Sequence, residues 1–285
     1  MRIYEMASSQ NGRFFLAAES EKTVAAYEAD TGRKIGEYRT HFESGGKRMC
    51  IMDDGRYFAA AAYGRFGITL YETETGHALW TTKEVKRVQK IVFSADETTL
   101  LALNADERLY TISCTDGTIL SVEKAITKAF SDVALDVKLI NKAQLIWNNM
   151  SANLENKKIL RMCSGGGSVF CAILGGGLTC FSDSGNMVWH AESKPEEHYT
   201  RLCFCPKHNL IIGIGYKFGS SRTRPYHFTD GYSVETGDLV FSSELDTDSF
   251  EYTFVNQGEG IVSNTGKVYS LDQTGVSFTG TQLEM

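Results

Sequence analysis

The sequence predicts an all-β fold made of one repeated unit of four antiparallel strands. The first observation is a hairpin signal, an apolar strand that runs into a polar turn ending in glycine. It returns at Gly32, Gly76, Gly117, Gly185, Gly237 and Gly275. The second is an apolar strand, a polar turn and a strand of small residues, which precedes the hairpin by roughly 20 residues. Helical periodicity of comparable strength is lacking. A four-stranded unit repeated in this order is typical of a single β-propeller.

The clearest copy of the hairpin spans residues 70–80, where Glu72, Glu74 and Thr75 precede Gly76. Glycine supplies the positive φ that a tight hairpin turn needs, and acidic side chains and threonine can hydrogen-bond the turn backbone. The intervals between the six turn glycines are 44, 41, 68, 52 and 38 residues. Propeller blades of four strands repeat at roughly 40–45 residues. We therefore predict one propeller domain over residues 1–285, with this turn beside the outer strand of each blade.

The second landmark supplies the inner half of each unit. It appears at residues 6–18, 52–60, 91–102 and 202–213. The strand after its polar turn is rich in alanine and glycine. Small residues suit a crowded position near a common axis, where the sheets of a propeller converge.

Residues 126–180 break this rhythm. Strands are expected at 134–140, 143–148, 158–163 and 168–174, followed by a hairpin of 178–181 with 187–190. These make six strands, or seven if 126–130 is counted, whereas two full blades need eight. Either one blade lacks or disguises a strand, or a single blade carries an insertion. We favour seven four-stranded blades, with six as the alternative.

Composition bears on the partners and the compartment. The formal net charge is −6 and the sequence pI about 5.6, which argues against a general nucleic-acid binder because phosphate binding needs a concentrated positive surface. No apolar run reaches the length of a membrane span. The first residues lack the apolar region of a secretory signal, although a chain whose signal peptide had been removed would look the same. We expect a cytoplasmic monomer with neither nucleic-acid nor membrane partners.

The cysteines agree with a reducing compartment. There are seven, an odd number at irregular positions and mostly flanked by apolar residues. This pattern is typical of free, buried thiols rather than of a disulfide framework. Cys203, Cys205 and His208 resemble a metal cluster, but the same slot elsewhere in the repeat holds residues 93–96, so we interpret these cysteines as structural. We expect no metal site.

Two kinds of repeat resemblance follow from these residues. Residues 23–35 resemble a unit of the WD-repeat propellers, with Tyr27-Glu28 where Trp-Asp would stand and Thr40-His41 where Gly-His would stand. Residues 72–80 and 184–189 resemble the quinoprotein-type repeat instead, because a tryptophan follows the turn glycine by four positions. The resemblance covers nearly the whole chain and implies a β-propeller fold. It implies little about function, since this architecture serves many unrelated activities.

Catalytic signals are lacking in the sequence. No Gly-x-Ser-x-Gly nucleophile motif occurs, and neither does a kinase or zinc-hydrolase signature. Although quinone-dependent enzymes share the repeat, nothing in the sequence identifies a calcium or quinone site. We therefore expect no catalytic residues, no cofactor and no enzymatic activity.

The strongest candidate for a binding site is an insertion at residues 217–228, which accounts for the interval of 52 residues. It gathers basic and aromatic side chains on an acidic protein: Lys217, Arg222, Arg224, Tyr226 and His227. Inserted loops on a rigid scaffold often carry binding functions, and arginine and tyrosine are frequent interface hot spots. The plainer alternative is a solvated hairpin tip. A second candidate is the amide-rich segment 147–156, for which the plainer alternative is a long loop.

These observations favour a non-enzymatic protein-binding propeller, in which the insertion around Arg222 and Arg224 meets an acidic partner surface. One form of this hypothesis is an inhibitor or immunity-type protein that covers the active site of its partner. The alternative is a small-molecule-binding or hydrolytic propeller that uses its central channel. That alternative requires convergent Asp, Glu, His or Asn side chains at the ends of the inner strands.

Overall fold

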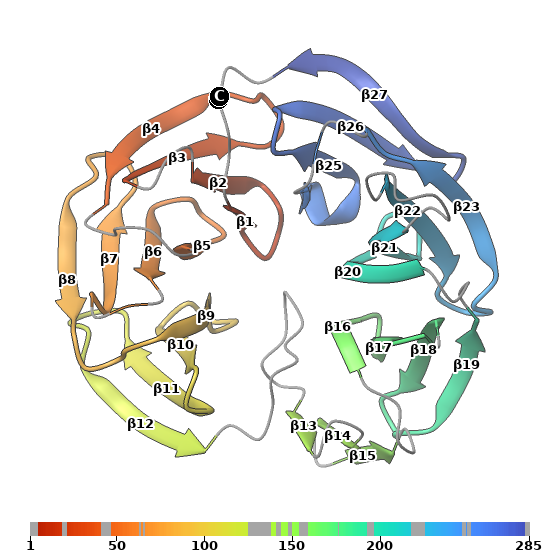
Figure 1. Cartoon of the computed structure of the whole chain (residues 1–285), viewed down its shortest axis with the longest axis horizontal. Helices are drawn as coiled ribbons and strands as arrows, with labels where there is room; N and C mark the ends of the chain where they lie inside the picture. Colours follow the sequence, from red (N-terminus) through yellow and green to blue (C-terminus); the bar gives the residue numbers. More distant parts are fainter. Residues whose placement is uncertain are drawn as a thin grey trace.

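A computed structural model shows a ring of small antiparallel sheets around a central axis (Figure 1). It describes residues 5–18, 22–40, 47–62, 64, 66–124, 138–140, 144–147, 150–153, 159–175, 177–192, 197–217, 226–246, 249 and 252–282. Within each sheet the strands follow their order in the sequence, the first lying near the axis and the last at the rim. The predicted all-β propeller is thereby confirmed.

Six of the sheets are complete blades of four strands. The first contains β1 (Glu5–Ser8), β2 (Phe14–Ala18), β3 (Thr23–Glu28) and β4 (Lys34–Arg39). The next contains β5 (Lys47–Ile51), β6 (Tyr57–Ala62), β7 (Ile68–Glu72) and β8 (Ala78–Thr82). Then come β9 (Val88–Phe93), β10 (Thr99–Asn104), β11 (Arg108–Ser113) and β12 (Ile119–Lys124).

The other three complete blades occupy the second half of the chain. They are β16 (Ile159–Gly165), β17 (Ser168–Ile173), β18 (Gly177–Ser182) and β19 (Met187–Ala191); β20 (Glu197–Cys205), β21 (Leu210–Lys217), β22 (Tyr226–Ser233) and β23 (Leu239–Glu244); and β24 (Tyr252–Val255), β25 (Gly260–Ser263), β26 (Lys267–Asp272) and β27 (Gly275–Gln282).

Between β12 and β16 lies a sheet of three strands, β13 (Lys138–Ile140), β14 (Gln144–Trp147) and β15 (Met150–Asn153) (Figure 1). The described structure thus has six four-stranded blades, which matches the alternative of six and not the seven that we favoured. The expected strands at 134–140 and 143–148 are confirmed in their described parts by β13 and β14, positions 134–137, 143 and 148 lie outside the described residues, and β15 was missed. The segment 126–130 lies outside the described residues.

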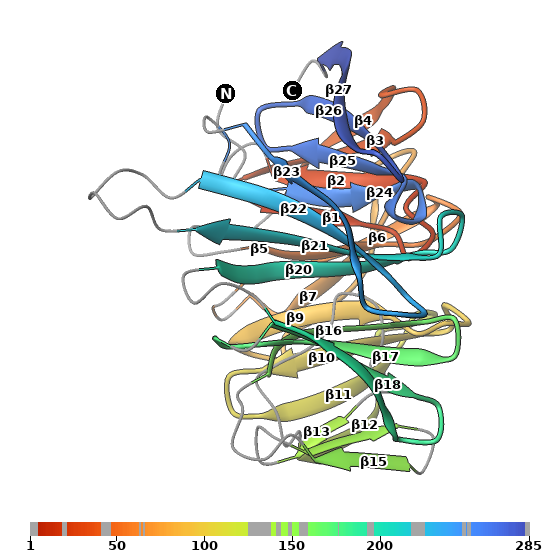
Figure 2. The same ribbon diagram turned by 90° about the vertical axis from the view of Figure 1, so that its right-hand side faces the viewer.

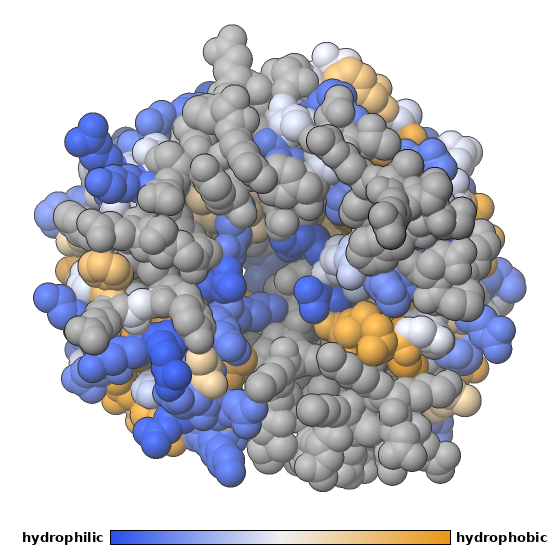
Figure 3. Space-filling view, in the orientation of Figure 1, coloured by the Kyte–Doolittle hydropathy of each residue, from blue (hydrophilic) through white to orange (hydrophobic). Residues whose placement is uncertain are grey.

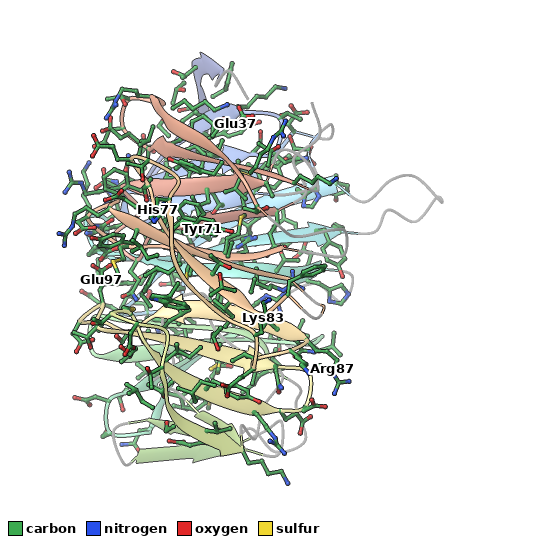
Figure 4. All side chains as sticks on the ribbon, turned by 90° about the vertical axis from the view of Figure 1, so that its left-hand side faces the viewer. Glu37, Tyr71, His77, Lys83, Arg87 and Glu97 are labelled. Carbon is green, nitrogen blue, oxygen red and sulfur yellow. The ribbon has the colours of Figure 1, made fainter. Side chains whose placement is uncertain are left out.

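Antiparallel blades place their connections alternately on two faces of the ring. The front face, toward the viewer in Figure 1, receives the connections from second to third strands and from one blade to the next. The back face receives the hairpin turns that join first to second and third to fourth strands. Figure 4 shows Arg87 on the front face and His77 and Glu97 on the back face. The long β21–β22 hairpin runs toward the front (Figure 2).

Apolar side chains fill the spaces between adjacent blades, because each sheet can bury its faces only against its neighbours. One cluster joins the first two blades, where the Phe58 ring stacks on Tyr71 with 4.8 Å between centroids. The strand of small residues is confirmed at β6, in which Ala59, Ala60 and Ala61 are fully buried. Alanine there leaves room for the neighbouring inner strand.

The hairpin turn that recurs in the sequence is a docking point between blades. Trp80 of β8 donates its indole N–H to the backbone oxygen of Cys114 in the next blade, at 2.8 Å. Its ring lies over the turn glycine of that blade, since a Cβ added to Gly117 would stand 2.7 Å from Trp80 Cε3. Gly117 also has φ +76°, so both backbone conformation and space require glycine.

Two other blade pairs repeat this arrangement. Trp189 of β19 donates to the backbone oxygen of Val234 at 2.7 Å, and a Cβ on Gly237 would lie 2.6 Å from its Cδ2. Tyr38 of β4 donates its hydroxyl to the backbone oxygen of Thr73. In all three pairs the accepting carbonyl belongs to the third residue before the turn glycine. The turn position thus requires glycine because the aromatic ring of the preceding blade occupies the space that a Cβ atom would need.

The ring closes by contacts between the first and last blades without exchange of a strand. The backbone N–H of Asn256 donates to the oxygen of Gly12 at 2.7 Å. Met6 and Phe15 of the first blade share a buried cluster with Val255 and Val262 of the last. The only helical element among the described residues is the 3₁₀ turn η1 (Asn256–Gly258). The described part of the chain thus holds no helix that is long and apolar enough to cross a membrane.

All seven cysteines are free, as the sequence indicated. Five are buried, whereas Cys114 and Cys203 are half-buried. Cys205 belongs to the cluster between the last two blades and Cys203 packs against it. This placement agrees with the structural interpretation of the Cys203 and Cys205 pair.

Candidate functional site in the central channel

A cavity of about 570 Å³ follows the central axis. It is lined by the inner strands β1, β5, β9, β16, β20 and β24, with contributions from β10, β21 and β22. Figure 3 shows the front face hollowed at the axis, with hydrophilic residues around the opening. Pockets of this size are typical of small-ligand sites.

The lining is basic although the chain as a whole is acidic. Its described residues include Arg48, Lys90, Arg161 and Arg201, whereas Glu5 is the one carboxylate among them. Among the described lining residues, the convergent acidic side chains that a hydrolytic version of the alternative requires are therefore lacking. Within the described residues, no group of three or more His, Cys, Asp or Glu side chains could hold a metal ion.

Arg48 links two inner strands and carries a carboxylate partner. Its Nε donates to the backbone oxygen of Gln89 at 2.5 Å, and its Nη1 lies 2.7 Å from Glu5 Oε2. Gln89 is the extra residue of a β-bulge in β9, because Lys90 pairs with Leu103 while Val88 pairs with Asn104. A bulge residue is left out of the strand ladder, so its carbonyl is open to a side-chain donor.

Arg161 makes the same link three sheets further round the ring. Its Nε donates to the backbone oxygen of Thr200, and its Nη1 donates to the oxygen of Leu160 at 2.7 Å. Thr200 is again a bulge residue, in β20, where Tyr199 pairs with Gly215 and Arg201 with Ile214. The two arginines thus hold quasi-equivalent positions on opposite sides of the ring.

Sequence reasoning missed these arginines, although a signal was present. The inner strands β5, β16 and β20 contain the tripeptides Arg48-Met49-Cys50, Arg161-Met162-Cys163 and Arg201-Leu202-Cys203. An arginine repeated two positions before a cysteine in the inner strands could have pointed to the channel. Cys50, which also lines the cavity, is buried, and burial raises the pKa of its thiol well above the usual value.

The structure brings one of the five predicted site residues into the channel wall. His227 lines the cavity and its ring lies 5.2 Å from that of Tyr252. Lys217 and Tyr226 are paired at the front end of the β21–β22 hairpin, with Lys217 Nζ 6.0 Å from the Tyr226 ring centroid. Arg222 and Arg224 lie outside the described residues, so the proposed cluster stays a prediction.

Lys217 is held by its own blade. Its Nζ lies 3.5 Å from Glu197 Oε1, and the two side chains are 20 % and 15 % exposed. The second sequence candidate, residues 147–156, is a hairpin in its described part, where Trp147 of β14 pairs with Met150 of β15. Residues 150–153 of that segment therefore form a strand, and 148, 149 and 154–156 lie outside the described residues.

A buried polar network stiffens the blade that carries the hairpin. The Tyr199 hydroxyl donates to Asp230 Oδ2 at 2.6 Å and lies 2.7 Å from the Tyr232 hydroxyl. Burial, together with the nearby Asp230 carboxylate, raises the pKa of Tyr199, and burial raises the pKa of Tyr232 to about 12. Both tyrosines are thus neutral donors at physiological pH.

Comparisons with known proteins agree with this architecture. A family model described as the outer membrane protein assembly factor BamB matches residues 19–125. No curated protein sequence matches the chain significantly.

Solved structures match over nearly the whole chain. The C-terminal WD40 domain of Sif2 has a TM-score of 0.67 at 12 % identity, covering 99 % of this chain and 88 % of that one. Kluyveromyces lactis Hsv2 has a TM-score of 0.74 at 10 % identity, covering 99 % of both chains. BamB from Moraxella catarrhalis has a TM-score of 0.59 at 15 % identity, covering 99 % and 87 %. The resemblance to WD-repeat and quinoprotein-like propellers is confirmed at the level of fold.

Proposed function

We propose that this chain is a non-enzymatic protein-binding scaffold whose front face meets an acidic surface of its partner. The observation that carries the proposal is the long blade of β20, β21 and β22. The inner strand β20 has 9 residues, whereas the inner strands of the other complete blades have 4 to 7. The middle strands β21 and β22 have 8 each, whereas those of the other complete blades have 4 to 6. The strands β21 and β22 run together to the front face of the ring (Figure 2).

Charge favours the front face over the back. The back-face turns of the described blades hold eleven acidic residues: Asp30, Asp53, Asp54, Glu74, Asp96, Glu97, Asp116, Asp183, Glu235, Asp238 and Glu259. The same turns hold four lysines and arginines: Arg13, Arg33, Arg56 and Lys207. An acidic partner is repelled from such a surface. The front face offers the basic channel opening and the end of the hairpin instead.

The residues predicted from the sequence fit this role in chemistry. Tyr226 and Lys217 stand at the base of the insertion, with His227 beside them in the channel wall. Arg222 and Arg224 belong to the intervening segment in sequence. In one form of the proposal the chain is an inhibitor or immunity-type protein, and the insertion enters the active site of a partner. The free thiols support a cytoplasmic setting.

The test is capture from native lysate with matched charge-reversal variants. The full chain is compared with Arg222→Glu/Arg224→Glu and with the back-face control Arg33→Glu/Arg56→Glu, whose arginines are 62 % and 71 % exposed. We expect a partner that binds the native chain and the control, is lost from the front-face variant, and weakens as salt rises. A partner retained equally by both variants contradicts the role of the insertion.

A further inference from the structure

We propose that the central channel is also a binding site for a small, multiply charged oxyanion, of the phosphate or polycarboxylate class, with Arg161 as its principal ligand. The site is separate from protein binding on the hairpin. It rests on the difference between the two quasi-equivalent arginines in the channel wall.

Arg48 and Arg161 make the same hydrogen bond between inner strands but differ in whether a carboxylate lies beside them. Each donates Nε–H to the carbonyl of a bulge residue in the next inner strand. The Arg48 charge is balanced by Glu5, the first residue of β1. The printed hydrogen bonds of Arg161 go to backbone oxygens alone. Among the described residues, a carboxylate thus accompanies one arginine and not the other.

The contacts of Arg161 leave part of its guanidinium available. Among the described residues it donates to two backbone carbonyls, those of Thr200 and Leu160, and contacts no carboxylate. A guanidinium has five N–H donors in a planar fork that matches carboxylate and phosphate geometry. Since Nε and one N–H of Nη1 are used, three N–H groups stay available to an oxyanion in the cavity.

The surroundings favour a charged ligand rather than a neutral one. Lys90 and Arg201, each the residue after a bulge, line the same cavity. A cation in a half-enclosed cavity is screened by salt less than one on an open surface. The volume of about 570 Å³ leaves room for a ligand larger than a single phosphate. A di- or trianion complements a described lining that holds four cations and one carboxylate.

The experiment is isothermal titration of the full chain with inorganic phosphate, pyrophosphate and citrate, paired with thermal unfolding in each anion. The main variant is Arg161→Gln, and the control is Arg56→Gln, which removes an exposed back-face arginine. Lys90→Gln is a second channel variant, included because Arg161→Gln also removes two hydrogen bonds to the backbone, one of them between strands. Comparing phosphate and pyrophosphate with citrate shows whether the channel prefers a phosphate or a polycarboxylate.

A charge-assisted hydrogen bond typically contributes enough for at least a tenfold change in affinity. We expect at least one of the three anions to bind with one site per chain, Arg161→Gln to weaken it tenfold or more, Lys90→Gln to weaken it severalfold, and Arg56→Gln to leave it unchanged. If Arg161→Gln does not fold, loss of affinity in Lys90→Gln against the control carries the result. Absence of binding at millimolar anion, or equal affinity in the channel variants and the control, overturns the proposal.

Discussion

Removal of a single indole N–H between two blades should measurably destabilise the whole ring. Trp189 is 8 % exposed, its ring lies over Gly237, and its N–H donates to the Val234 carbonyl at 2.7 Å. Trp189→Phe keeps an aromatic ring against Phe170 but deletes the donor. We expect the variant to fold with the same secondary structure and lower stability.

The magnitude follows from two terms. A buried carbonyl left without its donor costs about 1–3 kcal/mol. The smaller ring loses apolar contact of about 1 kcal/mol, at about 25 cal/mol per Å². The sum is about 2–4 kcal/mol. With an unfolding entropy of about 2.1 cal/mol/K per residue, this lowers the Tm of a chain of this size by about 3–7 °C.

The assay is thermal and urea unfolding followed by circular dichroism, since tryptophan fluorescence is itself altered by the change. The matched control is Met187→Ala in the same strand, whose side chain is 63 % exposed and should shift stability by no more than about 0.5 kcal/mol. If Trp189→Phe is no less stable than the control, the indole contact does not join the blades as argued.

Three further predictions concern other parts of the ring. Gly117→Ala combines a strained φ with a Cβ 2.7 Å from Trp80, so it should lower the free energy of unfolding in urea by at least about 1 kcal/mol. The control Gly175→Ala, with φ +64° and no atom near its Cβ, should lower it by less. Tyr199→Phe removes the donor to buried Asp230 and should cost about 1–3 kcal/mol at neutral pH; an unchanged midpoint contradicts this. Burial raises the pKa of Cys180 from 9.0 to about 11, so its contribution to stability is complete below pH 9 and lost as pH rises through 11. Between pH 9 and 11 the urea midpoint should fall less steeply in Cys180→Ala than in the native chain, and equal slopes would contradict the assignment.

Much of the fold could be predicted because turn chemistry is local. The glycine turns at positions such as 76 and 237 mark the third and fourth strands directly in the sequence. The partner of each turn could not be predicted, because Trp80 and Trp189 act on the blade that follows. The strand β15 was missed since Met-Ser-Ala-Asn lacks the β-branched and aromatic residues that mark strands.

For the candidate site, too, one part could be predicted from the sequence and another could not. The insertion was visible in sequence because it lengthens one interval between turn glycines. The channel was not, because its basic lining depends on bulges at residues 89 and 200 and on strands brought together by closure of the ring. The repeated Arg-Met-Cys tripeptide was the available signal, and its meaning depends on knowing that those strands are innermost.

Hydrogen–deuterium exchange of the full chain, with and without a captured partner, shows which face of the ring binds. We predict slower exchange on binding in the β21–β22 hairpin, residues 210–233, and at the front ends of neighbouring strands, with no change in the back-face turns at 52–56 and 73–77. Protection confined to those acidic back-face turns would contradict the claim that the front face carries the function.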